Sequence, residues 1–196
     1  MKFVIPGRAK REPGIQSDLH IIVIVPLDSG LALRAPRNDE ENFMPLQLSA
    51  ITEATAQLIA TAMLRLDTPG AGFTDITGHA ASFLAQIGAG EGTLLIFLRH
   101  TSASLTIQEN ADPDVQTDLI SALDRLAPED APWIHDVEGP DDMPAHVKAM
   151  LTGVSLHVPV TGAKLALGAW QGIYLVEHRR RPHSREIVLQ FVGSRK

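Results

Sequence analysis

The sequence predicts an α+β fold that consists mostly of antiparallel sheet, arranged like a sandwich with two or three helices, after an irregular N-terminal extension. Two helical patterns lie in the middle of the chain, a run of strand-like segments follows them, and no internal repeat is found. Because strands and helices do not alternate along the chain, a β/α barrel and a doubly wound parallel sheet are disfavoured.

Residues 1–60 differ in composition from the rest of the chain. They hold five prolines, a charged patch and one isolated strand-like run at residues 20–25. A lone short strand is marginal in water, so we expect an extension that is largely irregular or disordered. A short helix is predicted at residues 49–60, and an extra pair of strands at the domain edge is the alternative. The compact domain is then residues 61–196, in which Met63 offers an alternative start of the chain.

The first half of this domain shows one helix among strands. Alternating apolar and charged residues at 64–67 predict an edge strand, and residues 77–87 predict a short helix. Residues 93–98 are nearly all apolar, which is typical of a strand covered on both faces. Residues 104–108 continue as a strand after the turn at His100.

Two helix starts follow. Asp112 is a favourable N-cap before Pro113, and apolar residues then recur at helical spacing until Pro128. A second helix is predicted to start at Asp142, again as an N-cap, and to end at Gly153.

Four strand-like segments complete the chain, at residues 155–160, 163–167, 172–177 and 186–192. Short turn sequences separate the first three, which predicts an antiparallel meander.

Composition limits the classes of function. The net charge of −6 argues against nucleic-acid binding, and the absence of cysteine excludes a thiolate nucleophile or a cysteine-ligated metal. The longest apolar runs are far shorter than the ~20 residues that span a bilayer, and the N-terminus lacks a secretory pattern. We therefore expect a cytoplasmic protein without nucleic-acid or membrane partners.

Residues 99–145 hold the candidate chemistry. The segment from His135 to His146 alone contains two imidazoles and four carboxylates. These groups bind divalent cations or transfer protons near neutral pH, although an acidic loop with Gly and Pro is also a common solvated turn. With His100 upstream, three imidazoles and a carboxylate could form an open site for Zn²⁺ or a similar metal. The alternative is that the histidines donate to phosphate oxygens beside Arg185.

Three blocks of sequence now resemble a known family: residues 100–113, residues 135–146, and residues 168–173 with Glu177 and Arg185. They are similar, in order, to the YjbQ family. The resemblance implies a compact α+β domain, assembly as a trimer, and a weak thiamine phosphate synthase activity. That reaction joins an aminopyrimidine methyl diphosphate to a thiazole phosphate and releases pyrophosphate, so the expected ligand is a phosphorylated small molecule.

Motif and chemistry together give the candidate site residues. The candidate catalytic residues are His100, Ser102, Asn110, Asp112, His135, Asp142, His146 and Glu177. The candidate substrate-binding residues are Thr101, Trp170, Gln171 and Arg185, with Trp170 placed to stack on a heteroaromatic ring. The candidate metal ligands are His100, His135 and His146, for Mg²⁺ or Zn²⁺.

The basic run after Glu177 has a simpler interpretation. Arg179–Arg181 is predicted to be a solvated hairpin tip, and His178 lies where the sequence departs from the family pattern. Two rival functions stay open: a metal-dependent hydrolase of a phosphorylated metabolite, and a non-catalytic trimer that binds a metal or a small ligand.

Overall fold

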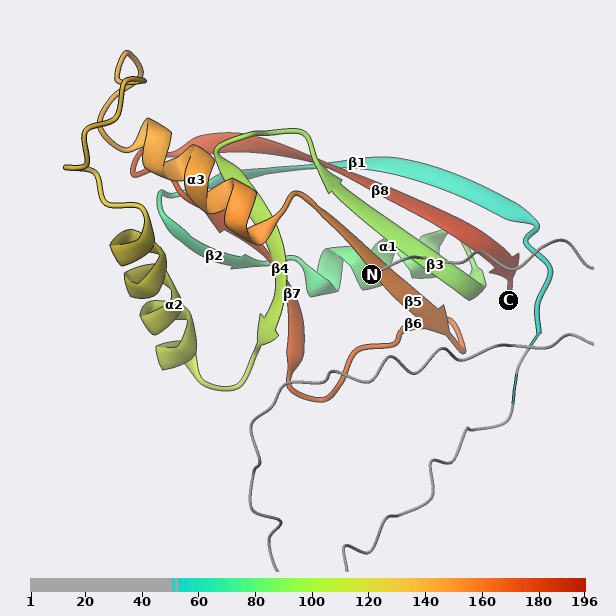
Figure 1. The fold of residues 1–196 in the computed structure, drawn as a ribbon. Helices are drawn as coiled ribbons and strands as arrows, with labels where there is room; N and C mark the ends of the chain where they lie inside the picture. Colours follow the sequence, from blue (N-terminus) through green and yellow to red (C-terminus); the bar gives the residue numbers. More distant parts are fainter. Residues whose placement is uncertain (1–50, 52) are drawn as a thin grey trace, which may run out of the picture. The chain divides into compact units, whose positions relative to one another are not determined.

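Two antiparallel sheets surround a shared hydrophobic core in the computed structural model, which describes residue 51 and residues 53–196 (Figure 1). One sheet has the strand order β1-β8-β3-β5-β6, and the other has the order β2-β7-β4. The strands are β1 Leu58–Thr68, β2 Gly72–Asp75, β3 Ala89–Leu98, β4 Ala103–Glu109, β5 Ser155–Thr161, β6 Lys164–Leu165, β7 Gln171–Glu177 and β8 His183–Arg195. The helices are α1 Thr77–Gln86, α2 Pro113–Leu126 and α3 Asp142–Thr152. The predicted α+β class is confirmed.

The long strand β8 organises the core. It lies between β1 and β3, and its side chains alternate between the two faces of the sheet, so that Ile187, Leu189 and Phe191 are buried. Leu94 and Ile96 of β3 join them in the same core. Each such side chain contributes about 1.5–3 kcal/mol when it is fully buried. The prediction that residues 93–98 are covered on both faces is wrong, because Phe97 on the outer face is 42% exposed.

The two longer helices start differently. Asp112 accepts a hydrogen bond from Asp114 N at 2.9 Å and Pro113 is the first helical residue, which confirms the predicted N-cap of α2. In α3 the N-cap is Asp141, and Asp142 is the first helical residue. The predicted N-cap role of Asp142 is therefore wrong, because its carboxylate faces side chains from elsewhere in the fold. None of the helices in residues 53–196 has the length and apolarity needed to span a bilayer.

The predicted helix at residues 49–60 is wrong where the structure describes it. Residues 51 and 53–57 form no helix, and β1 begins at Leu58, where pairing with β8 outweighs the local helical pattern. β1 is an edge strand, as predicted for residues 64–67, but it begins five residues before Met63. The strand-like run at residues 20–25 lies outside the described residues.

The predicted meander of residues 155–177 is half right. β5 and β6 pair as expected, but β7 pairs with β2 and β4 in the other sheet. β7 is buried along almost its whole length, so the centre of the three-stranded sheet suits it better than a place beside the two-residue strand β6.

Three connections meet at one end of the two sheets and position the candidate site. They are the turn between β3 and β4, residues 99–102, the long loop between α2 and α3, residues 127–141, and the turn between β7 and β8, residues 178–182 (Figure 1). Hydrogen bonds join α3 to the first turn and the third turn to the loop. Rigid strands thus present polar residues from distant parts of the sequence together.

Candidate functional site

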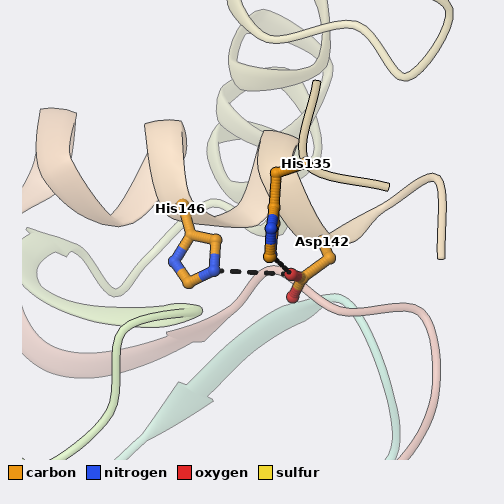
Figure 2. Close-up of side chains that lie close together, drawn as sticks. All are labelled: His135, Asp142 and His146. Carbon is orange, nitrogen blue, oxygen red and sulfur yellow. Dashed lines mark hydrogen bonds and ion pairs between the residues drawn. The ribbon is translucent and has the colours of Figure 1, made fainter. Parts of the chain in front are cut away.

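Two histidines flank one carboxylate at the start of α3. His135 comes from the loop that precedes the helix, and Asp142 and His146 lie one turn apart on it (Figure 2). Asp142 Oδ2 lies 2.7 Å from His135 Nε2 and 3.4 Å from His146 Nε2. One ligand atom from each of the three residues lies within 4.8 Å of the others, which is a spacing that could hold a metal ion.

The backbone fixes the orientation of His146. Its Nδ1 lies 3.0 Å from the carbonyl oxygen of Thr101. Because a carbonyl oxygen only accepts, Nδ1 carries a proton, and Nε2 is the nitrogen directed at Asp142. A lone pair facing a carboxylate oxygen is unfavourable unless a cation or a further proton lies between them. This hydrogen-bond pattern is also the usual second-shell arrangement of a metal-bound histidine.

Arg179 contacts carboxylates at and beside the histidine cluster, which consists of His135, Asp142 and His146. Its Nη1 contacts Asp142 Oδ1, its Nε lies 3.2 Å from Asp141 Oδ2, and its Nη2 donates to the carbonyl oxygen of Glu138 at 2.9 Å. The side chain is buried, so the prediction that residues 179–181 form a solvated hairpin tip is wrong for Arg179. The signal in the sequence is complementary charge, since an acidic loop precedes α3 and a basic turn follows β7.

The electrostatics of this contact favour the ionised forms. Burial tends to raise the pKa of Asp141, but hydrogen bonds from the Arg180 backbone and the Arg179 side chain outweigh it and lower that pKa. Burial likewise tends to lower the pKa of Arg179, and the hydrogen bond and charge of Asp141 raise it overall. Arg179 and Asp141 therefore form an ion pair at neutral pH.

Glu177 and Arg185 form a buried bidentate pair behind the cluster. Arg185 Nη2 and Nε donate to Glu177 Oε1 and Oε2 at 2.6 and 2.7 Å, and Thr68 Oγ1 donates to Oε2 at 2.8 Å. Burial opposes ionisation of Glu177, but these donors lower its pKa. With their polar atoms committed to each other, both residues position the surrounding turns rather than face a ligand.

His100 and Ser102 belong to this supporting layer. Glu186 N donates to His100 Nε2 at 2.9 Å, and Arg185 Nη2 lies 3.2 Å from Ser102 Oγ. Burial and the charge of Arg185 lower the pKa of His100, so its ring is neutral. The structure places His100 outside the three-residue group, because the nitrogen that would bind a metal already accepts a backbone hydrogen bond.

The remaining predicted residues lie at the opposite end of the β4–β7 pair. Glu109 pairs with Gln171 and Ala103 pairs with Glu177, so six residues of strand, roughly 20 Å, separate the two ends. Asn110 N donates to the carbonyl oxygen of Trp170 at 3.0 Å, and Trp170 is 67% exposed. The structure therefore separates Asn110, Asp112, Trp170 and Gln171 from the histidine cluster.

A second polar group, which the sequence did not reveal, consists of the buried residues His178, Ser104 and Lys148 and the exposed Asp124. His178 Nε2 lies 2.9 Å from Ser104 Oγ, and the nearby Lys148 Nζ lies 2.5 Å from Asp124 Oδ1. Burial and the charge of Lys148 lower the pKa of His178 to about 4. Only the tertiary structure shows this environment, because its members lie far apart in the chain.

The donor set of the cluster fits a borderline divalent cation. Two imidazole nitrogens and one carboxylate oxygen suit Zn²⁺, whereas Mg²⁺ prefers oxygen ligands alone. Three protein ligands leave a tetrahedral position free for a small molecule. The side chain of His135 is 48% exposed, so the group is accessible from solvent.

Comparison with known proteins agrees with the motifs. The family model described as "UPF0047 protein YjbQ-like" matches residues 62–194. A UPF0047 protein of Synechocystis sp. is 45% identical over 132 residues, which are 67% of this chain and 90% of that protein. The UPF0047 protein YjbQ of Escherichia coli O157:H7 is 40% identical over 131 residues, covering 66% of this chain and 95% of that one.

Solved structures share the fold. A hypothetical protein from Aeropyrum pernix superimposes with a TM-score of 0.64 at 28% identity, covering 69% of this chain and 99% of its own. A conserved protein of the yjbq/upf0047 family from Clostridium acetobutylicum gives a TM-score of 0.59 at 36% identity, covering 67% of this chain and 98% of its own.

Proposed function

The chain belongs to the YjbQ-like UPF0047 family, and we propose that it is a metal-dependent enzyme acting on a phosphorylated small molecule at His135, Asp142 and His146. The observation that carries this proposal is the orientation of His146. Its Nδ1 lies 3.0 Å from the Thr101 carbonyl oxygen, which directs its Nε2 at the carboxylate of Asp142, 3.4 Å away. A cation between these atoms would take both Nε2 and Oδ2 as ligands.

The surrounding charges support the same assignment. Arg179 contacts the other oxygen of Asp142 and leaves Oδ2 directed at the histidines. Ligand sets of this kind lose 10- to 100-fold in metal affinity when the second-shell partner is removed. We assign Arg179 as a positioning residue, because its donors contact protein carboxylates and a carbonyl oxygen.

Thiamine phosphate formation is the reaction that the family resemblance suggests for this site. The thiazole nitrogen of one substrate would form a C–N bond to the pyrimidine methylene carbon of the other. The C–O bond to the diphosphate would break, and pyrophosphate would leave with the bonding electron pair. A bound cation would supply charge stabilisation for the leaving oxygens. The protein would hold that cation with His135, Asp142 and His146, and orient His146 through Thr101.

Hydrolysis of a phosphorylated metabolite is the second candidate, and the accessibility of the cluster favours it. The side chain of His135 is 48% exposed and that of His146 is 33% exposed, so water reaches both. An enzyme that transfers a reactive group to an acceptor usually excludes water from the site. The two reactions would use the same residues and differ in the acceptor.

The test is a parallel measurement of product release with Zn²⁺ and with Mg²⁺. Pyrophosphate release that requires the thiazole phosphate would support thiamine phosphate synthesis, and phosphate release without it would support hydrolysis. A rate within about a hundredfold of the ~10 s⁻¹ of typical enzymes would identify the physiological reaction. His135→Ala should abolish either activity, and the exposed His157→Ala should retain it. Tight zinc binding without turnover would contradict the enzyme proposal and favour a non-catalytic binding protein.

A further inference from the structure

A cavity of about 350 Å³ lies where the end of α2 and the loop after it face α3 and the turn between β7 and β8. It shares no residue with the histidine cluster, so it is a separate place where a small molecule can bind. Each of these four elements contributes charged or polar side chains to its walls. These side chains are Asp124, Glu129, Asp130, Lys148, His178 and Arg180.

The inner wall of the cavity carries a buried cation. Lys148 is 7% exposed, and lysine is seldom buried to this degree unless its ammonium group is paired. Its Nζ has three donors, and within residues 53–196 the hydrogen bond that it makes is to Asp124 Oδ1, at 2.5 Å. The side chain of Asp124 is 61% exposed and lies in the last turn of α2, where the helix dipole disfavours a carboxylate. Lys148 therefore has donors left for an anion in the cavity.

His178 adds a neutral donor to the same wall. It is 4% exposed, and its Nε2 lies 2.9 Å from Ser104 Oγ. Burial and the charge of Lys148 lower its pKa to about 4, so the ring is neutral at pH 7. When Ser104 donates to Nε2, the ring proton lies on Nδ1 and can be donated to an acceptor in the cavity. A carboxylate between Lys148 and His178 would then receive hydrogen bonds from both.

The outer wall carries an excess of negative charge. Glu129 and Asp130 lie in the loop after α2, and Arg180 Nη2 lies 2.7 Å from Glu129 Oε1. Asp130 is exposed, and none of the ion pairs in the described part of the chain includes it. Because the other carboxylates of the lining are paired with Lys148 and Arg180, Asp130 is the acidic group that is left for a cationic group of a ligand.

The two walls together restrict the ligand. A simple anion would meet the like charges of Asp124, Glu129 and Asp130, and a simple cation would meet those of Lys148 and Arg180. A molecule that carries both charges can place each of them beside its opposite. Sites for small molecules measure roughly 300–1,000 Å³, so this cavity, at the lower end of that range, suits a small metabolite.

We propose that this cavity binds a small amino carboxylate, whose carboxylate group lies between Lys148 and His178 and whose ammonium group lies at Asp130. The inference goes beyond the proposed function, because neither the cation at the histidine cluster nor a phosphorylated substrate takes part in it.

The experiment compares molecules of one carbon skeleton on the metal-free full chain at neutral pH, by ligand-observed NMR titration. Butanoate carries the anion alone and butylamine the cation alone. 4-Aminobutanoate carries both charges, and 2-aminobutanoate carries them closer together. We expect at least one aminobutanoate to bind about tenfold more tightly than butanoate and butylamine, because a hydrogen bond to a charged group contributes about this factor or more.

Two variants locate the two ends of the ligand. Asp130→Asn should lower the affinity for the aminobutanoate to that for butanoate, and Lys148→Met should abolish binding of both. Asp118→Asn is the matched control for the first variant, because Asp118 is exposed on α2 and does not line the cavity. Lys164→Met, at an exposed position of β6, is the control for the second. Both controls should keep the affinities of the natural protein.

Each outcome supports or overturns the proposal. A preference for an aminobutanoate that is lost in Asp130→Asn and kept in Asp118→Asn supports it. Equal affinities for all four molecules, or a preference that survives Asp130→Asn, overturn it. Because Asp130 is exposed, its variant gives this answer even where Lys148→Met does not fold. A preference that is lost in His135→Ala would place the ligand at the histidine cluster and would also overturn the proposal.

Discussion

Individual residues at this site have either a ligand-facing or a supporting role, and buried contacts distinguish them. Glu177 and Arg185 are 1% and 3% exposed and satisfy each other, so they support the fold around the site. His135, Asp142 and His146 instead direct the atoms that could bind a metal at one another. Replacing Glu177 would leave a buried guanidinium without its partner, a change that typically costs 3–5 kcal/mol. Loss of activity in such a variant would therefore reflect loss of structure.

The contacts of Arg179 predict how a substitution there changes zinc affinity. Arg179→Lys keeps the positive charge but loses the several contacts that hold Asp142 and Asp141 together. We expect zinc affinity to fall about 10- to 100-fold, measured by competition with a chelating dye. The exposed Arg181→Lys is the control and should bind zinc normally. Unchanged affinity in a folded Arg179→Lys protein would contradict the positioning role.

His178 predicts a pH dependence of stability. In the unfolded chain its ring titrates near its ordinary pKa of 6.5, whereas burial lowers the pKa in the folded protein to about 4. Between these values the unfolded state binds more protons, so the free energy of unfolding falls as the pH falls. The contribution is fully present above pH 6.5 and is lost by about pH 4, with a total on the order of 3 kcal/mol.

Urea unfolding at several pH values from 4.5 to 7 measures this effect. In His178→Gln the dependence should become shallower, because the replacement does not titrate. The exposed His157→Gln should keep the slope of the natural protein. Identical slopes in all three proteins would show that His178 is not held neutral.

The helices show which elements can be predicted from local sequence. The start of α2 was found because an N-cap and a proline act within a few residues of each other. The N-cap of α3 is predicted at Asp142, one residue after the N-cap Asp141 that the structure shows. The strand β7 was assigned correctly in the sequence but to the wrong sheet, because pairing depends on strands far away in the chain.

The N-cap role of Asp112 predicts how its substitution changes the stability of the protein. Asp112→Ala removes the acceptor for Asp114 N, which lies 2.9 Å away. We expect a loss of about 1 kcal/mol in the free energy of unfolding, measured with urea. Asp118→Ala, an exposed residue inside the same helix, should change stability by less than about 0.5 kcal/mol. A loss of activity in Asp112→Ala without a loss of stability would instead restore its predicted catalytic role.

The outer face of the five-stranded sheet carries exposed apolar side chains that could form a contact between copies of the chain. Ile59, Met63 and Val192 are 72%, 42% and 41% exposed, and Ile59 pairs with Val192. Contiguous exposed apolar side chains of this kind often mark a contact with another chain. The family resemblance predicts a trimer, and such a face is where a contact between copies would bury apolar surface.

Sedimentation at several protein concentrations tests this assembly. We expect a trimer, and Met63→Lys should shift it toward the monomer, because a charge buried in a contact without a partner is unfavourable. Leu126→Lys, an exposed apolar residue of α2, is the control and should leave the assembly unchanged. If copies share the site, activity should fall together with the trimer on dilution. Activity that persists in monomers would contradict a shared site.

The sequence by itself determined the α+β class, the family, the N-cap of α2 and the segment that carries two of the histidines, because these depend on composition and on spacing within a few residues. Only the tertiary structure decided which residues meet. Arg179 reaches Asp142 across 37 positions and His146 reaches Thr101 across 45, while Asn110 and Trp170 lie at the far end of the same strand pair. Such contacts follow from strand pairing and burial, which act between distant segments and leave no local pattern.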